Sequence, residues 1–483
     1  MESKEGIVTY FPELYIDGKW RSGSGGRRFP VTDPADGTVI AEFAAASEAD
    51  CTEAVAAAER AFPAWAATPA RERSEILRRT YEILTAEAET FAAIMVRENG
   101  KSWADAMGEA SYAKELFRWF AEEAVRIPGD YRMSPSGDKR IVVTRQPIGV
   151  SLLITPWNFP AAMATRKIAP ALAAGCTVIL KPARETPLTA AYMVGVLERA
   201  GLPAGVVNLV TPVPTGPPVA AILAHPAVRK LSFTGSTEVG RELLHACAGT
   251  VVSASMELGG NAPLIVLPGA DLDEAVDGAF AAKMRNGGSA CTAANRFYVH
   301  DSVHDAFVER FAARLSAMKV GSGLDPANDL GALVSVTERD KVADLVESAR
   351  ADGATVVTGG TGTERGAFYP PTLLTGIEHG TRITTTEIFG PVAPVIRFHD
   401  VDDVVRQAND TIFGLMAYVF GEEREAMAVA LRLEAGMVAV NRGVVSDPAA
   451  PFGGMKQSGL GREGSNAGII EFLEEKYLAL PAL

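Results

Sequence analysis

The sequence predicts an α/β protein with two parallel sheets. Between residues 148 and 257, short apolar runs alternate with helical stretches, and a second alternating stretch follows from residue 264 to about residue 440. Parallel β-α-β units are the most economical explanation of such alternation. The chain has 483 residues, of which 47% are hydrophobic and 22% are charged. We therefore expect two or three ordered domains rather than a single core.

The individual elements are predicted in chain order. Apolar residues at helical spacing predict two or three long helices over residues 47–125, which would cover a sheet. Residues 140–145 (RIVVTR) are β-branched and bounded by turn residues, which indicates a strand pair that leaves the body of the protein. Strands are then expected at 150–154, 177–180, 206–210, 230–233 and 251–256, and helices of the second stretch at 273–285 and 303–318.

The composition argues against several classes of partner. A formal net charge of −13 repels nucleic acid and an anionic membrane surface. Residues 1–10 (MESKEGIVTY) lack the apolar run of a secretory signal, and no later stretch approaches the ~20 apolar residues of a membrane span. Four cysteines without a C-x-x-C pair and six scattered histidines predict neither disulfides nor a metal site. We expect a cytoplasmic protein that binds no metal, nucleic acid or membrane.

Cys291 is the first candidate for chemistry. It lies in residues 286–296 (NGGSACTAANR), where small neighbours let a substrate approach the thiol closely. A thiolate is a strong nucleophile. A free cysteine is more often a small buried core residue, so the assignment depends on its context.

Two polar residues that follow predicted strands supply that context. Ligands bind beyond the carboxyl ends of the strands in open parallel sheets. Glu257, in residues 256–263 (MELGGNAP), ends a strand beside two glycines, as a general base would. Asn158, in residues 154–160 (ITPWNFP), lies in a stiff loop from which its amide could donate to an oxyanion. Taken singly, Glu257 is better explained as a solvated or salt-bridged glutamate at a turn, and Asn158 could merely cap or turn its loop.

Two segments contain glycine beside serine or lysine, as phosphate-binding loops do. Gly235 and Ser236, in residues 233–240 (FTGSTEVG), stand between a strand and a helix and suit a dinucleotide pyrophosphate, although the signal is weak alone. Residues 100–102 (GKS) do not form a nucleotide-triphosphate loop, because no glycine stands five residues before Gly100.

Together and in this order, these motifs resemble those of the aldehyde dehydrogenase superfamily, and the resemblance runs through essentially the whole chain. Further matches are residues 181–187 (KPARETP), 387–391 (EIFGP) and 451–464 (PFGGMKQSGLGREG). The resemblance implies an aldehyde dehydrogenase-like α/β fold in a homodimer or homotetramer. Its parts would be a Rossmann-type cofactor domain (1–126 and 147–257), an α/β catalytic domain (258–460) and a small β oligomerisation element (127–146 and 461–483).

The resemblance also implies a reaction that needs no metal. Cys291 attacks the aldehyde carbonyl, the Asn158 amide and the Cys291 N–H hold the oxyanion, and a hydride passes to a nicotinamide. A thioester remains, and Glu257 activates the water that releases the carboxylic acid. These roles agree with the chemistry of the residue types. Lys167 matches a position in the same cleft and is the fourth catalytic candidate.

The cofactor is expected to be NADP, or NAD. The resemblance implies that Lys181 lies at the adenosine ribose. Many NAD-preferring members carry Glu where this chain has Arg184, and a cation there favours a 2′-phosphate. Arg184 could instead point to solvent and pair with Glu185. The other matching cofactor positions are Thr155, Pro156, Trp157, Gly235, Ser236, Glu387 and Phe389.

The substrate is expected to be a small-molecule aldehyde that carries a carboxylate. Residues 161–167 (AAMATRK) and 284–291 (MRNGGSAC) resemble succinate-semialdehyde dehydrogenases in particular. That resemblance implies that Arg166, Arg285 and Ser446 hold the distant carboxylate of succinate semialdehyde, or of a near relative such as glutarate semialdehyde.

Two alternatives stay open at this stage. The two arginines could be ordinary surface or ion-pair residues, and the substrate a neutral or amine-bearing aldehyde. The chain could also be a non-catalytic binding protein on the same scaffold. Asp447, beside Ser446, would disfavour a dicarboxylate product. Ala293 stands where some relatives have a second cysteine, which removes a regulatory disulfide.

Overall fold

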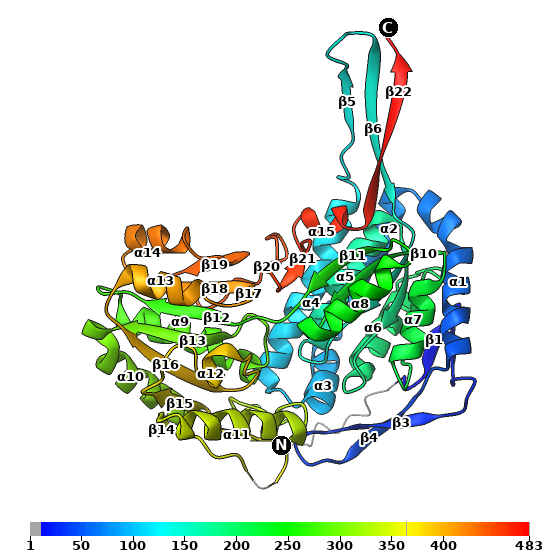
Figure 1. The fold of residues 1–483 in the computed structure, drawn as a ribbon. Coiled ribbons are helices and arrows are strands. Elements are labelled where there is room, and N and C mark those ends of the chain that lie inside the picture. Colours follow the sequence, from blue (N-terminus) through cyan, green and yellow to red (C-terminus); the bar gives the residue numbers. More distant parts are fainter. Residues whose placement is uncertain (1–10, 364, 483) are drawn as a thin grey trace.

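The computed structural model describes residues 11–363 and 365–482. They form two α/β bodies side by side, which we call the first body and the second body, and an arm that protrudes from the first body (Figure 1). The expectation that residues 1–10 contain no secretory signal lies outside the described residues. Within the described ranges, no helix is long and apolar enough to cross a membrane.

The first body is built on an eight-stranded sheet in the order β2-β1-β9-β8-β7-β10-β11-β21. Its five central strands run parallel, and all five were predicted from sequence. The strands are β1 (Leu14–Ile16), β2 (Lys19–Arg21), β7 (Val150–Ile154), β8 (Thr177–Lys181), β9 (Val207–Leu209), β10 (Val228–Thr234), β11 (Ser253–Glu257) and β21 (Gly459–Leu460).

The strand order reverses between β7 and β10. The chain runs from β7 through β8 to β9 on one side, then returns to β10 beside β7 and continues to β11. In a doubly wound sheet, the crevice at such a reversal is where ligands bind. The loops that follow β7 and β10, at residues 155–159 and 235–236, therefore meet at the expected ligand edge.

Eight helices of the described chain cover the two faces of this sheet. Four of them span the region for which two or three helices were predicted. Those four are α1 (Glu48–Ala67), α2 (Ala70–Ala86), α3 (Ala88–Asn99) and α4 (Trp103–Ala124), and the others are α5 (Pro160–Ala174), α6 (Pro187–Arg199), α7 (Gly216–Ala224) and α8 (Thr237–Ala248). Side chains of α2–α6 form the core on one face, and α1, α7 and α8 cover the other.

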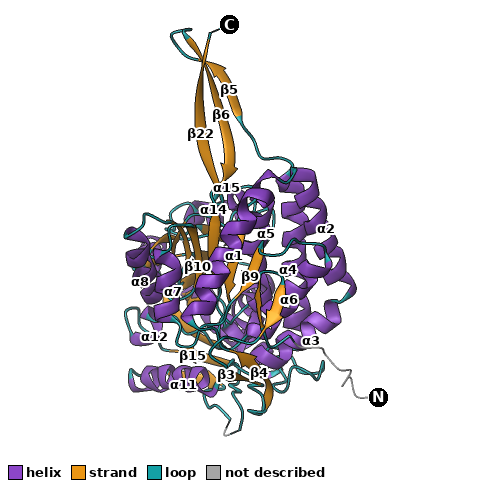
Figure 2. Ribbon diagram, turned by 90° about the vertical axis from the view of Figure 1, so that its right-hand side faces the viewer, coloured by secondary structure: helices purple, strands orange, loops and turns teal. Residues whose placement is uncertain are grey.

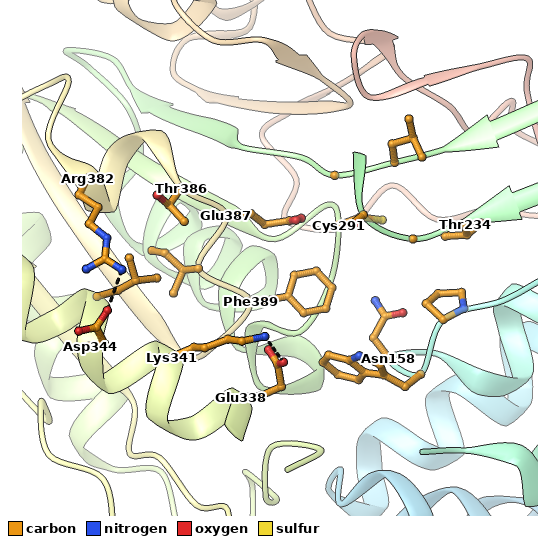
Figure 3. A pocket seen from close by; sticks show the side chains of 18 residues that line it. Asn158, Thr234, Cys291, Glu338, Lys341, Asp344, Arg382, Thr386, Glu387 and Phe389 are labelled. Carbon is orange, nitrogen blue, oxygen red and sulfur yellow. Dashed lines mark hydrogen bonds and ion pairs between the residues drawn. The ribbon is translucent and has the colours of Figure 1, made fainter. Parts of the chain in front are cut away.

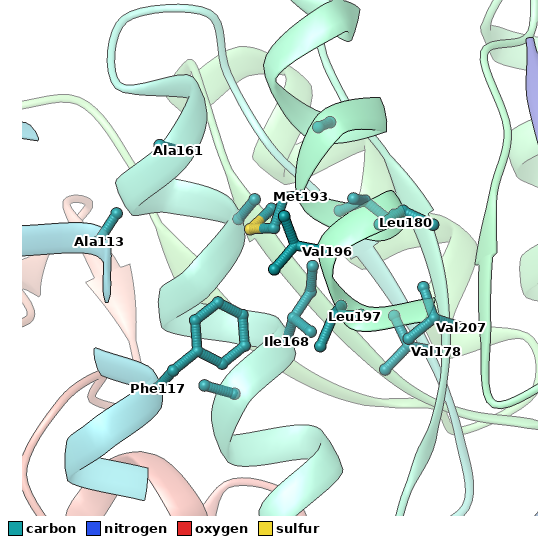
Figure 4. Close-up of a cluster of buried hydrophobic side chains, with 14 of the residues drawn as sticks. Ala113, Phe117, Ala161, Ile168, Val178, Leu180, Met193, Val196, Leu197 and Val207 are labelled. Atoms are coloured by element: carbon teal, nitrogen blue, oxygen red, sulfur yellow. The ribbon is translucent and has the colours of Figure 1, made fainter. Parts of the chain in front are cut away.

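Local sequence explains where several helices begin and which faces they bury. The Ser47 side chain accepts a hydrogen bond from Asp50 N, while the Asp50 carboxylate accepts from Ser47 N, so a capping box starts α1. In the core formed by α2–α6, which we call the first core, Phe117 of α4, Ile168 of α5 and Leu197 of α6 are fully buried (Figure 4). Truncating such a phenylalanine to alanine typically costs about 3–5 kcal/mol.

The second body is built on a seven-stranded sheet in the order β14-β15-β16-β13-β12-β18-β19, parallel except for β14. The strands are β12 (Ala262–Val266), β13 (Ala294–His300), β14 (Thr355–Thr358), β15 (Thr372–Thr375), β16 (Val392–Phe398), β18 (Met416–Phe420) and β19 (Met437–Val440). The helices are α9 (Leu272–Met284), η1 (Arg285–Gly288), α10 (Asp301–Ser316), α11 (Val336–Ala351), α12 (Arg382–Thr385), α13 (Val401–Asn409) and α14 (Glu423–Ala430). The helices predicted at 273–285 and 303–318 are confirmed as α9 and α10.

The two sheets present opposite ends to the cleft between them. The chain leaves β11 at Glu257 and enters β12 at Ala262, so the carboxyl end of the first sheet meets the amino end of the second. The functional loops of the second body therefore precede its strands, whereas those of the first body follow theirs. Cys291 comes before β13, and Glu387 and Phe389 come before β16.

A three-stranded antiparallel sheet forms the arm, in the order β22-β6-β5 (Figures 1 and 2). Its strands are β5 (Asp130–Met133), β6 (Lys139–Pro147) and β22 (Leu473–Pro481). The short helix α15 (Ala467–Ile470) precedes β22, and Ile469 and Phe472 are buried in the first core. Two small pairs complete the fold: β3 (Arg28–Thr32) with β4 (Val39–Ala44), and β17 (Phe413–Gly414) with β20 (Met455–Lys456). The domain boundaries given above stay predictions.

Candidate active site

Two cavities meet at Cys291 in the cleft between the two bodies. The first, of about 420 Å³, is walled by the loops after β7 and β10 on one side and by the second body on the other. Figure 3 shows Asn158 and Thr234 facing Glu387 and Phe389 across it. The second cavity, of about 400 Å³, lies between α4, α5 and residues 444–452. Because Cys291 lines both cavities, molecules held in the two cavities can meet at its sulfur.

The Cys291 loop packs closely against the turn that follows β11. A Cβ on Gly260 would come within 2.2 Å of the Cys291 carbonyl oxygen, so only glycine allows this approach. The thiol is half-buried, and burial raises its pKa to about 12. The Arg166 guanidinium acts in the opposite direction, while Glu257 raises the pKa further. The thiol is therefore protonated at neutral pH.

Glu257 is the last residue of β11, as its place after an apolar run predicted. Its carboxylate is buried, and neither oxygen has a hydrogen-bond partner among the described residues. Burial raises its pKa well above the usual range, and the nearby Glu463 carboxylate adds to this. Glu257 lines neither cavity, so its side chain must turn to reach a substrate on Cys291. No hydrogen bond opposes that turn.

The loop between β7 and α5 carries Asn158 into the first cavity. Its Nδ2 donates to the carbonyl oxygen of Ser289 at 3.1 Å, two residues before Cys291. An amide nitrogen has two hydrogens, so one stays available for an oxyanion beside the sulfur.

Lys167 lies behind these residues and lines neither cavity. Its Nζ donates to Ser232 Oγ at 3.0 Å and forms an ion pair with Glu463. The side chains of both ion-pair partners are buried. Sequence analysis did not single out Glu463, although it lies within the matching residues 451–464. The sequence shows Glu463 only as an acidic residue beside a glycine in residues 461–464 (GREG), and this pattern does not distinguish a functional carboxylate from a turn residue.

The predicted cofactor residues fall into two groups. Pro156, Trp157, Gly235, Ser236, Glu387 and Phe389 line the first cavity, whereas Thr155, Lys181 and Arg184 lie outside its walls. Trp157 and Phe389 meet edge to face with ring centres 5.4 Å apart. Glu387 accepts a hydrogen bond from Gly260 N at 3.1 Å, and burial raises its pKa to about 7.

The first cavity fits a dinucleotide. Ser236 caps α8, and the first-turn N–H groups of that helix favour an anion. At Gly235, a Cβ would lie 2.4 Å from the Phe233 ring, so bare backbone is presented to the cavity. The neighbouring loops are joined, since Thr155 N donates to Lys181 O at 3.1 Å. Burial lowers the pKa of Lys181. Arg184 is exposed, and its guanidinium lies 5.7 Å from the centre of the Phe29 ring.

Arg166, Arg285 and Ser446 all line the second cavity. Arg166 Nε and Nη2 donate to the hydroxyl of Tyr112 at 3.2 and 2.9 Å, and the guanidinium lies 3.8 Å from the centre of the Phe452 ring. Its buried Nη1 has no hydrogen-bond partner among the described residues. Arg285 makes a long hydrogen bond, 3.4 Å, from Nη2 to Thr292 Oγ1. Both guanidinium groups therefore retain donors for an anion.

Asp447, the carboxylate expected to disfavour a substrate anion, does not line the second cavity. Asp447 is exposed, lies outside the cavity walls and accepts a hydrogen bond from Ala449 N at 2.8 Å. The carboxylates that line the second cavity are Asp105 and Glu109. Asp105 accepts from the Ser102 hydroxyl at 3.1 Å, and Glu109 is fully engaged elsewhere, as described below.

The chain matches known proteins over nearly its full length. A model of the aldehyde dehydrogenase family matches residues 20–478. The chain is 47% identical over 469 residues to a glutarate-semialdehyde dehydrogenase of Pseudomonas putida, with 97% of each protein covered. It is 46% identical over 470 residues to the succinate-semialdehyde dehydrogenase [NADP(+)] GabD of Escherichia coli, again with 97% of each covered. A crystal structure of succinate-semialdehyde dehydrogenase from Burkholderia pseudomallei superposes with a TM-score of 0.97 at 44% identity over 100% of both chains. This chain belongs to the aldehyde dehydrogenase family.

Proposed function

We propose that this aldehyde dehydrogenase oxidises the semialdehyde of a short dicarboxylic acid, with succinate semialdehyde first and glutarate semialdehyde second, and uses NADP. The observation that carries the proposal is the position of Cys291 at the junction of two cavities. One cavity fits a dinucleotide, and the other is lined by two arginines with free donors. The names of the two relatives above, which act on four- and five-carbon semialdehydes, support this choice.

The reaction divides among the residues at the junction. The Cys291 thiol releases its proton to solvent water as the sulfur bonds to the aldehyde carbon, and the Asn158 Nδ2 and the Cys291 N–H hold the resulting oxyanion. A nicotinamide cofactor supplies the hydride acceptor. When the hydride leaves, the carbon becomes a thioester of Cys291. Glu257 then removes a proton from water, the water oxygen bonds to the carbon, and the carbon–sulfur bond breaks to give acid and thiol.

The two arginines would hold the far end of the substrate. Arg166 Nη1 is buried and lies 4.0 Å from Glu463 Oε2, which is close enough for an ion pair but too far for a hydrogen bond, so this donor has no hydrogen-bond partner among the described residues. A substrate carboxylate between Arg166 and Arg285 would satisfy it and fix the aldehyde carbon near the sulfur.

Rates with charged and neutral aldehydes test this clamp. For Arg285→Ala, we expect kcat/KM for succinate semialdehyde to fall roughly 30- to 1000-fold, as when one partner of a buried charge pair is removed. The rate with butyraldehyde should change less than about threefold. Arg442→Ala is the matched control, because Arg442 is exposed and lines neither cavity. An equal loss on both aldehydes contradicts the clamp.

The preference for NADP depends on the cations near the adenosine end of the cleft. Among the described ion pairs, none joins Arg184 to Glu185, and the exposed guanidinium is available to a 2′-phosphate. The Escherichia coli relative is named for NADP(+). We expect Arg184→Glu to lower the ratio of kcat/KM for NADP over NAD at least tenfold, because a like charge repels the phosphate. Glu185→Gln should leave this ratio within about twofold, and an unchanged ratio in Arg184→Glu contradicts the assignment.

A further inference from the structure

The loop that presents Asn158 is held by a segment of the first body far away in sequence. Asn99 Nδ2 donates to Trp157 O at 2.9 Å, and Lys101 Nζ donates to Asn158 O at 2.9 Å. Two successive carbonyl groups of the loop are thus fixed by side chains two residues apart. Lys101 belongs to residues 100–102 (GKS), which do not match a loop that binds nucleotide triphosphates.

A buried ion pair completes this support. Lys101 Nζ pairs with Glu109 of α4, and their side chains are 1% and 0% exposed. The other Glu109 oxygen accepts from Ala161 N at 2.8 Å and Ala162 N at 3.1 Å, in the first turn of α5. Glu109 therefore caps α5, the helix that begins two residues after Asn158 and carries Arg166.

The same segment joins the two bodies beside the sulfur. Gly100, with φ of 89°, ends α3, and its carbonyl accepts from Ala332 N of the second body at 2.8 Å. From the second body, Asn286 Nδ2 also donates to Asn158 O, at 2.9 Å. The Asn158 backbone is thereby fixed between both bodies, and the direction of its amide toward Ser289 and Cys291 follows from that placement.

We propose that Lys101 and Glu109 are positioning residues for the oxyanion amide. Lys101 lines neither cavity, and Glu109 lines the second cavity with both carboxylate oxygens already bonded to Lys101 and to the first turn of α5, so the pair acts by holding the Asn158 carbonyl and the start of α5 in one geometry. A displacement of about 1 Å in a catalytic group is enough to cost a large part of its effect. The inference rests on the proposed role of Asn158.

A merely structural ion pair predicts something different. Such a pair would lower the stability of the fold when broken, and its effect on rate would multiply with that of any other variant. A pair that works through Asn158 has no remaining effect on the oxyanion once the amide is gone. The two cases are therefore separated by a double-mutant cycle.

The cycle compares Lys101→Met, Asn158→Ala and the double variant in the full-length enzyme. The measured quantity is the rate constant for the first turnover of NADPH formation at saturating NADP+ and saturating aldehyde, using whichever aldehyde wild type oxidises fastest. We expect Asn158→Ala to slow this step ~10²- to 10³-fold, as loss of an oxyanion donor does. Lys101→Met should slow it roughly 10- to 100-fold, and the double variant should lie within about threefold of Asn158→Ala.

Two controls distinguish a displaced Asn158 amide from a general loss of cofactor binding or of folded structure. The dissociation constant of NADP+, measured by fluorescence, should change less than about threefold in Lys101→Met. Ser47→Ala removes the side-chain cap of α1, which lines neither cavity, and should keep the wild-type rate within about twofold. If Lys101→Met does not fold, Lys101→Met/Glu109→Gln replaces it in the cycle, because it leaves no unpaired buried charge.

The outcomes are distinct. If the losses of Lys101→Met and Asn158→Ala multiply, or if Lys101→Met keeps the wild-type rate, the positioning role is wrong while the proposed function stands. If Asn158→Ala itself keeps the wild-type rate, the oxyanion role in the proposed function fails, and the positioning role with it.

Discussion

The environment of Cys291 holds its thiol in the neutral form, although the thiolate is the nucleophile. Burial raises the thiol pKa to about 12, and the largest opposing effect comes from the Arg166 guanidinium. The same arginine lines the substrate cavity and has a free buried donor. Arg166 therefore has two roles in our view of the site, since it lowers the thiol pKa and receives the substrate anion.

This double role predicts a change in thiol reactivity. Arg166→Met should raise the thiol pKa further and slow alkylation of Cys291 by iodoacetamide at pH 9 several-fold, because each pKa unit lowers the thiolate fraction tenfold. The modification at Cys291 is followed by mass spectrometry. Arg166→Lys keeps the charge with a shorter side chain and should react at close to the wild-type rate. Faster alkylation of Arg166→Met would show that the access of iodoacetamide to Cys291, and not the nearby charge, controls the reactivity of the thiol.

Burial is the largest cause of the raised pKa of Glu257, and Glu463 should raise further the pH at which Glu257 becomes a base. Because the Glu463 carboxylate raises the pKa of Glu257, Glu463→Gln should lower that pKa. A general base works in its ionised form, so activity rises as the pH passes upward through this pKa. We therefore expect the acid limb of the kcat–pH profile to move to lower pH in Glu463→Gln, by about half a unit or more. Lys167→Met removes a cation that lowers the same pKa, and should move the limb to higher pH.

At the scale of elements, periodicity located the five parallel strands of the first body and helices α9 and α10 to within about two residues, because each buries one consistent face, but it gave the strands of the second body only as an alternating stretch. It did not separate α2 from α3, which are divided by the single residue Glu87 with no proline or glycine nearby. Motifs located Cys291, Glu257 and Asn158. Lys101 and Glu109 could not be assigned, because the backbone groups that they bind lie more than 50 positions away and a buried ion pair has no local sequence pattern.

Buried carboxylates that cap helices give the fold a pH dependence. Glu98 accepts from Leu188 N at 2.7 Å and Thr189 N at 2.8 Å at the start of α6, and burial raises its pKa to about 8. The folded protein thus binds this proton more tightly than the unfolded chain. The resulting stabilisation is present below about pH 4.5 and is lost as the pH rises through about 8.

Glu98→Gln tests that dependence, because glutamine keeps an acceptor and does not titrate. We expect the variant to be less stable than wild type by about 1–2 kcal/mol at pH 5.5, and the difference to narrow at pH 8.5. Thermal unfolding at the two pH values measures it. Glu72→Gln, on the exposed first turn of α2, should show no such change. A difference that widens with pH contradicts the assignment.

At the scale of the whole molecule, one face of the arm carries apolar side chains that are exposed to solvent when the chain is taken alone. Tyr131 and Leu478 both pair with Val142 in register, and Met133 and Leu480 both pair with Arg140. Residues paired across strands, and residues two apart along them, share one face. Tyr131 is 59% exposed and Leu478 40% exposed on that face. Apolar patches of this kind mark interfaces, and the free edges of β5 and β22 can pair with another strand.

We therefore predict that the arm assembles copies of this chain into a homodimer or homotetramer. Leu478→Glu places a charge in the apolar face and should lower the mass in solution, measured by light scattering after size exclusion, toward that of one chain. Ala479→Glu is the matched control, because Ala479 pairs with Ile141 and points to the opposite face of the same strand. Burying an unpaired carboxylate in an interface costs several kcal/mol, whereas the same charge in solvent costs little. Dissociation by Ala479→Glu but not by Leu478→Glu would place the interface on the other face, and dissociation by neither would remove the arm from the assembly.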